Sequence, residues 1–286
     1  MKTPKVPFVL AALMLQCFCW AQIDSRPLVL GRSGTLHSKA LDGDRTINIY
    51  LPEGFSPKDT LSYPVIYVLD GGMEEDFVHI TGVVRFNAQP WIARFPPSIV
   101  VGIEGNTRTL DFTFAVPDLD FLEKEGFKKS AFPSFGGSEK YMDFLEGELL
   151  PYVERTYRAT GKRTIVGESL AGLLTTEILL KRPDMFDDYI IISPSLWWGE
   201  PSLLENAGQL PNEKLKKKVN VYIGAPNREE DVRMFAQAEN LFFILKDNEN
   251  IHPIFDYIPE ELHSTVMHQA VYNAFKKMYP KTAYSK

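Results

Sequence analysis

Short apolar runs alternate with longer segments of helical periodicity along most of this chain. The runs at 65–69 and 99–103 are apolar at every position, which is typical of strands buried on both faces of a parallel sheet. The segment 141–157 instead repeats its apolar side chains at the spacing of one helix face. The predicted strands are 47–51, 65–69, 99–103, a strand that ends at 166, 189–192, 219–223 and 254–258, and the predicted helices are 141–157, 170–181, 235–246 and 265–278.

This alternation predicts an α/β fold with a mostly parallel central sheet and helices on both faces. The pattern before residue 65 favours an antiparallel meander at one edge of that sheet. Sheets of this type bind their ligands at the carboxyl ends of the strands. We therefore expect a functional site on the loops that follow the parallel strands.

The first 21 residues have the features of a secretory signal peptide. Lys2 and Lys5 form a basic start, and the apolar run 8–15 is too short to span a bilayer. The small residues at Cys19 and Ala21 suit a signal peptidase, so we expect cleavage near Ala21 and an exported protein. A retained membrane anchor is the alternative interpretation.

Charge and cysteine content narrow the possible partners of the mature chain. The chain has 286 residues, 44% of them hydrophobic, and we expect 22–286 to form one domain. Loss of Lys2 and Lys5 would take the formal net charge from −6 to −8. An acidic protein has no electrostatic reason to bind nucleic acid or anionic lipid. Both cysteines lie in the signal segment, so no disulfide is expected.

The segment Gly167-Glu168-Ser169-Leu170-Ala171-Gly172 is the clearest chemical signal in the chain. It follows a strand, precedes a helix and places a serine between small residues. A nucleophile elbow has this arrangement, because the serine sits on a strained turn where strand and helix cross closely. The usual final glycine is replaced by Ala171. The competing interpretation is a serine that caps the helix.

A serine hydroxyl needs a base to take its proton, and three histidines follow Ser169. His263 lies between the last predicted strand and the last predicted helix, where a loop can deliver an imidazole to the end of the sheet. His252 enters the strand and His268 lies within the helix. We therefore predict His263 as the base, against a surface histidine that caps the helix.

The third member of a triad is expected after the strand 219–223, where three carboxylates follow one another. We favour Glu230 or Glu229 and place Asp231 third. The alternative is an acidic first helix turn that stabilises the helix dipole, and both interpretations can hold together. For the oxyanion we predict two backbone N–H donors, from Leu170 after the nucleophile and from Gly72 after the strand 65–69.

Several motifs together resemble the putative esterase family of α/β-hydrolases, over nearly the whole mature chain and in the family's order. They are Leu36-His37-Ser38-Lys39-Ala40-Leu41, Asn48-Ile49-Tyr50-Leu51-Pro52, Tyr63-Pro64-Val65-Ile66-Tyr67-Val68-Leu69-Asp70-Gly71, Val100-Val101-Gly102-Ile103, Arg108-Thr109-Leu110-Asp111, Gly167-Glu168-Ser169-Leu170-Ala171-Gly172 and Ser193-Pro194-Ser195-Leu196-Trp197-Trp198.

The resemblance implies an α/β-hydrolase fold and a carboxylic-ester hydrolase without a lid domain, a metal or another cofactor. Its siderophore trilactone esterases are the most similar branch, and some of these work without a well-placed acid. S-formylglutathione hydrolase and feruloyl esterases belong to the same group. Ala171 departs from the commonest motif, and the acid region matches the family only loosely.

Three further residues are candidates for substrate binding. Trp197 and Trp198 follow the strand 189–192 and could stack on aromatic acyl groups, or they could belong to the core. Arg108 could bind a substrate anion, although a contact with Asp111 or a backbone carbonyl is the competing role.

The sequence thus predicts a serine carboxylic-ester hydrolase that acts through an acyl-enzyme on a small ester, with a siderophore-type ester as one candidate. The alternatives are a feruloyl or acetyl esterase acting on polysaccharide-linked esters, and a non-catalytic binding protein with this fold. A zinc hydrolase is disfavoured because the five histidines form no metal-binding motif. No signal in the sequence indicates an oligomeric state.

Overall fold

The computed structural model describes residues 24–58, 60–200, 202–207 and 215–280. The predicted signal peptide, with Cys17 and Cys19, lies outside the described residues. Within the described ranges, no helix is both long and apolar enough to cross a membrane.

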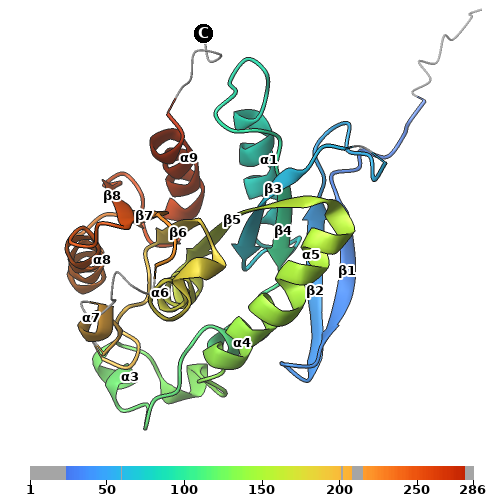
Figure 1. Ribbon diagram of the computed structural model, residues 1–286. Helices are drawn as coiled ribbons and strands as arrows, with labels where there is room; N and C mark the ends of the chain where they lie inside the picture. The colour runs from blue at the N-terminus through green and yellow to red at the C-terminus, as the bar shows by residue number, and fades with distance from the viewer. Residues whose placement is uncertain (1–23, 59, 201, 208–214, 281–286) are drawn as a thin grey trace, which may run out of the picture.

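One eight-stranded sheet runs through the molecule in the order β1-β2-β4-β3-β5-β6-β7-β8 (Figure 1). β1 and β2 are antiparallel to their neighbours, whereas β4, β3 and β5 to β8 are mutually parallel. The predicted antiparallel edge and parallel centre are both confirmed. The strands are β1 (Arg32–Ser38), β2 (Gly43–Tyr50), β3 (Tyr63–Leu69), β4 (Ile99–Ile103), β5 (Ala159–Glu168), β6 (Asp188–Ile192), β7 (Val219–Ala225) and β8 (Ile251–Tyr257).

Helices cover both faces of the sheet and bury two separate apolar clusters. On one face α1 and α9 lie side by side, and on the other α4 to α8 cover the strands (Figure 1). The helices are α1 (Phe77–Asn87), α2 (Arg108–Asp111), α3 (Phe121–Lys124), η1 (Lys129–Ala131), α4 (Ser138–Phe144), η2 (Leu145–Leu149), α5 (Leu150–Tyr157), α6 (Leu170–Lys181), η3 (Pro183–Met185), α7 (Ser202–Ala207), α8 (Val232–Leu245) and α9 (Val266–Met278).

The predicted helix 141–157 is present but contains a turn of different geometry. Proline has no N–H and its ring clashes with the carbonyl four residues earlier, so an ordinary helix is disfavoured at Pro151. The chain forms the π-helical turn η2 just before that residue, and the N–H of Leu150 bonds the carbonyl of Leu145. The wider turn lets the chain continue into α5 without a break.

Candidate active site

Ser169 occupies the turn between β5 and α6 in a strained backbone conformation, with φ 60° and ψ −120°. The turn is tight because β5 and α6 cross closely: a Cβ on Gly167 would lie 2.4 Å from the carbonyl oxygen of Ala171. The N–H of Ser169 bonds the carbonyl of Ile192, at the end of β6 (3.1 Å). Ala171 stands where the usual motif has a glycine, and its methyl group is fully buried. The tight turn therefore accommodates alanine at this position.

His263 lies on the loop between β8 and α9 and faces the serine. Its Nε2 is 3.1 Å from Oγ of Ser169, although the two residues are 94 positions apart. Its Nδ1 is 2.7 Å from Oγ of Ser193. For Nε2 to accept the Ser169 proton, the hydrogen of the neutral ring must be on Nδ1. That N–H then donates a hydrogen bond to the Ser193 hydroxyl. Burial lowers the pKa of His263 from its ordinary value, which favours the neutral ring that a base requires.

Ser193 contacts the imidazole, although no functional role was predicted for it from the sequence. It directly follows β6, its φ is 40° and its side chain is buried. Its N–H bonds the carbonyl of Gly224 at 2.8 Å, which fixes the turn against the end of β7. A serine directly after a parallel strand was the available signal. Ser195 is also close, with Oγ 3.3 Å from Oγ of Ser169.

Two of the three predicted acids, Glu230 and Asp231, act on the charge of His263, but their hydrogen bonds go to other groups. Oε2 of Glu230 accepts the backbone N–H of His263 at 2.6 Å. Asp231 is the N-cap of α8 and accepts the N–H of Met234 at 2.9 Å. Glu229 is exposed. Among the described residues, the hydrogen bond at Nδ1 thus goes to a hydroxyl, while Glu230 and Asp231 bond backbone N–H groups around the site.

Glu168, the last residue of β5, brings another carboxyl group to the reactive side of the imidazole. Its Oε1 lies 3.5 Å from Nε2 of His263. Burial raises the pKa of Glu168 to about 8, with smaller raising contributions from Asp70 and Asp76 and a lowering contribution from Arg108. In the sequence Glu168 is visible only as the residue between Gly167 and Ser169, and no motif signals its position beside the imidazole.

The two predicted oxyanion donors have different surroundings. Leu170 is the first residue of α6, and the first N–H groups of a helix have no partner within it. The N–H of Gly72 instead bonds Oε2 of Glu75 at 2.6 Å. Burial raises the pKa of Glu75, and the bonds from Gly72 and Gly105 oppose that rise. Gly72 can therefore serve an oxyanion only after the Glu75 carboxyl group moves away.

The predicted substrate-binding residues have protein partners in this structure. Arg108 forms an ion pair with Asp70 at 2.9 Å, while its side chain keeps 39% of its surface exposed. Trp198 is fully buried and its Nε1 donates to the carbonyl of Phe114 at 2.9 Å. Trp197 is 5% exposed and stacks on Phe127, with ring centroids 4.9 Å apart. Of the three, Arg108 presents the most surface to a ligand.

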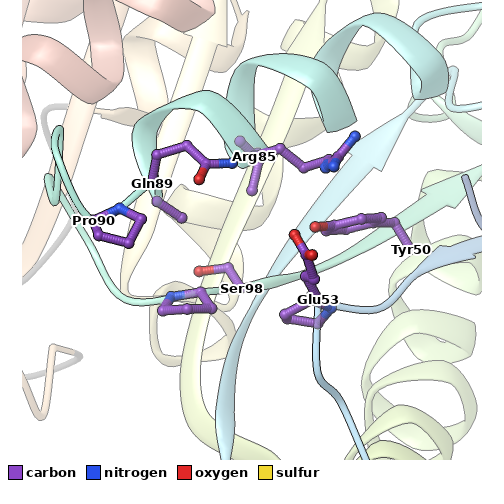
Figure 2. A pocket seen from close by; sticks show the side chains of 10 residues that line it. Tyr50, Glu53, Arg85, Gln89, Pro90 and Ser98 are labelled. Carbon is purple, nitrogen blue, oxygen red and sulfur yellow. The ribbon is translucent and has the colours of Figure 1, made fainter.

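A separate hollow of about 290 Å³ lies between α1 and the segments that follow β2 and precede β4 (Figure 2). Tyr50, Glu53, Arg85 and Gln89 line it, as Figure 2 shows. Tyr50 pairs with Val100 near the start of β4, so this hollow is at the opposite end of the sheet from Ser169. The described residues contain no cluster of histidine, cysteine or carboxylate side chains suited to hold a metal ion.

Comparison with known proteins assigns the chain to a family. The family described as "Putative esterase" matches residues 38–276, so the chain belongs to the putative esterase family. The ferri-bacillibactin esterase BesA of Bacillus subtilis (strain 168) is 32% identical over 212 residues, which are 70% of this chain and 72% of that protein.

Two solved structures share the fold at 26% identity and a TM-score of 0.77 each. One is an IroE-like serine hydrolase from Shewanella oneidensis, with 87% of this chain and 80% of that chain covered. The other is the BES protein from Bacillus cereus, with 92% and 100% covered. The predicted α/β-hydrolase fold and family resemblance are confirmed, and the comparisons support a hydrolase of esters.

Proposed function

We propose that this protein is a serine carboxylic-ester hydrolase that works through an acyl-enzyme. One observation carries the proposal: a serine in a strained strand-to-helix turn has its Oγ 3.1 Å from the Nε2 of a partly buried histidine. That distance is within proton-transfer reach, and the strained backbone presents the hydroxyl at the carboxyl edge of the sheet. A binding protein with this fold needs neither feature.

The proposed reaction begins when Nε2 of His263 takes the proton of Ser169 and Oγ attacks the ester carbonyl carbon. The electron pair of the carbonyl moves to its oxygen, which the N–H of Leu170 stabilises. The tetrahedral intermediate then releases the alcohol, which receives its proton from Nε2. Water repeats the sequence on the acyl-enzyme and frees Ser169.

Ser193 holds the imidazole in the tautomer that this reaction needs. Its Oγ lies 2.7 Å from Nδ1; when the hydroxyl accepts a hydrogen bond from Nδ1–H, Nε2 carries no hydrogen and faces Ser169. Glu230 fixes the backbone of the same residue through its bond to the His263 N–H. In this proposal Glu230 and Glu229 have no bond to the ring, and Gly72 becomes the second oxyanion donor once Glu75 releases it.

A siderophore-type ester is the proposed substrate class, because the named relative BesA is a ferri-bacillibactin esterase and its similarity covers 70% of this chain. The predicted signal peptide at 1–21 supports action outside the cytoplasm, with residues 22–286 as the mature domain. A feruloyl or acetyl ester linked to polysaccharide is the second candidate. Phe127 stacks on Trp197 and is partly exposed, so it could contact the aromatic acyl group of a feruloyl ester.

Labelling with a fluorophosphonate tests the proposed nucleophile. The reagent should add one group, located by peptide mass spectrometry on Ser169, and labelling should disappear in Ser169→Ala. Ser195→Ala is the matched control, because its hydroxyl lies 3.3 Å from that of Ser169 and should not be required. A label on Ser195 or Ser193, or no label on folded protein, contradicts the proposal.

A further inference from the structure

Among the described residues, no carboxylate bonds Nδ1 of the proposed base, the position from which a triad acid usually stabilises the imidazolium. When His263 takes the serine proton it becomes positively charged, and in a triad the acid offsets that charge from the Nδ1 side. Here Nδ1 meets the neutral hydroxyl of Ser193. Glu230 and Asp231 raise the pKa of His263, but their hydrogen bonds go to backbone N–H groups.

A carboxyl oxygen to which none of the described residues donates a hydrogen bond lies on the other side of the ring. Oε1 of Glu168 is 3.5 Å from Nε2 of His263. This oxygen is buried and none of the described residues donates a hydrogen bond to it. Glu168 pairs with Ile192 in the sheet, so its backbone position beside Ser169 is fixed. A buried acceptor left unsatisfied costs free energy unless it gains a partner during function.

We propose that the ionised Glu168 carboxylate stabilises the His263 imidazolium from the Nε2 side and so replaces the missing triad acid. The inference rests on the proposed function of Ser169 and His263. In the reaction the Ser169 proton moves to Nε2 and then to the leaving alcohol. Glu168 neither gives nor takes a proton and contributes only its negative charge.

Charged and titratable side chains from the neighbouring elements determine when Glu168 is ionised. Arg108 of α2 favours the carboxylate, whereas Asp70 after β3 and Asp76 before α1 disfavour it. His263 faces it from the β8–α9 loop. Burial is the largest effect and raises the pKa of Glu168 to about 8, so the carboxyl group is mostly protonated at pH 7 and becomes a carboxylate as the pH rises through that value.

This arrangement predicts an esterase whose rate rises in two steps with pH. The first step follows deprotonation of His263, whose pKa burial lowers from the ordinary histidine value. The second step, near pH 8, follows ionisation of Glu168. An opposite charge at this distance changes the proton affinity of a group by about tenfold or more, so we expect the second step to raise kcat/KM about tenfold.

The test is the pH profile of phenyl acetate hydrolysis for the wild-type protein and for Glu168→Gln, which keeps the size of the side chain and removes its charge. The second step should vanish in Glu168→Gln. The two proteins should then differ by about tenfold at high pH and by about twofold or less below pH 7, where Glu168 is already neutral. Glu230→Gln is the matched control: it also removes one carboxylate near His263, and it should keep the second step.

A Glu168→Gln profile that keeps both steps would overturn the inference, as would a control variant that loses the second step. If Glu168→Gln does not fold, ¹⁵N-histidine NMR of the wild-type protein decides. The Nε2 resonance of His263 should move a second time near the pKa of Glu168, about 8, and a single titration step contradicts the inference. Failure of the proposed function is distinguishable, because Ser169→Ala would then retain turnover whatever the profile of Glu168→Gln.

Discussion

Two neighbouring loops at the carboxyl edge of the sheet could each have supplied the third member of a triad, and they differ in what they deliver. The loop after β6 brings the hydroxyl of Ser193 to within 2.7 Å of Nδ1 of His263. The loop after β7 carries consecutive carboxylates at 229–231. Its hydrogen bond to His263 joins the Glu230 carboxylate to the backbone N–H of His263, not to the ring. A carboxylate that follows the expected strand therefore does not necessarily bond the imidazole.

The difference follows from competing donors. A carboxylate near the start of a helix or beside an open loop finds backbone N–H groups, which are strong partners there. Asp231 caps α8 and Glu230 bonds the His263 amide. Ser193 has no such competition, because its backbone is already bonded to Gly224 and its side chain is buried against the imidazole.

The largest effect is expected from removing the base on which both loops converge. His263→Ala should lower kcat by about a thousandfold or more, because serine then has no proton acceptor. His268→Ala is the control: His268 bonds the carboxylate of Asp76 at 2.9 Å and stacks on His79. The His268→Ala substitution should change kcat by less than about threefold. Equal losses in the two variants would mean that the base is wrongly assigned.

A smaller effect distinguishes the two loops directly. Ser193→Ala should lower kcat about fivefold, since it removes one neutral hydrogen bond worth about 1 kcal/mol that orients the ring. Glu230→Gln keeps an oxygen for the His263 N–H and should cost about twofold. It also removes a charge that raises the pKa of His263, so the acid limb of its rate profile should move to lower pH. Steady-state kinetics across the pH range measures both, and a greater loss of kcat in Glu230→Gln would reverse the comparison.

The smallest effect concerns a residue of the same β6 loop farther from the reaction. Esters of phenylacetic acid carry an aromatic acyl group, and esters of acetic acid do not. Trp197→Ala should leave the ratio of activities on the two within about twofold of wild type, because Trp197 is buried against Phe127. It should lower the melting temperature, since a large core side chain is lost. A selective loss of activity on the aromatic ester would instead place this indole in the acyl pocket.

The sequence predicts elements well where burial dominates. The strand 99–103 and the helix 170–181 have the predicted bounds, because both are enclosed by the core. Helix α1 was not predicted. Its β-branched residues Val78, Ile80 and Thr81 favour strands locally, but Phe77, Ile80 and Val84 lie on the buried face of a helix that packs beside α9.

The candidate site divides in the same way. The elbow at Ser169 follows from local sequence, since small residues and a strand-to-helix change are visible in the chain. The pairing of His263 with Ser193 spans 70 positions, and the bond from Glu75 to Gly72 depends on how the loop after β3 folds back. Such contacts are set by tertiary structure, and motif spacing carries no information about them.

Hydrolysis of p-nitrophenyl acetate by Ser169→Ala, measured beside wild type with circular dichroism to verify folding, tests the central claim most directly. The reaction proceeds through the Ser169 oxygen in this account, so turnover should fall by about a thousandfold or more while the spectrum stays the same. A folded variant that hydrolyses the ester at the wild-type rate would show that the reactive oxygen lies elsewhere.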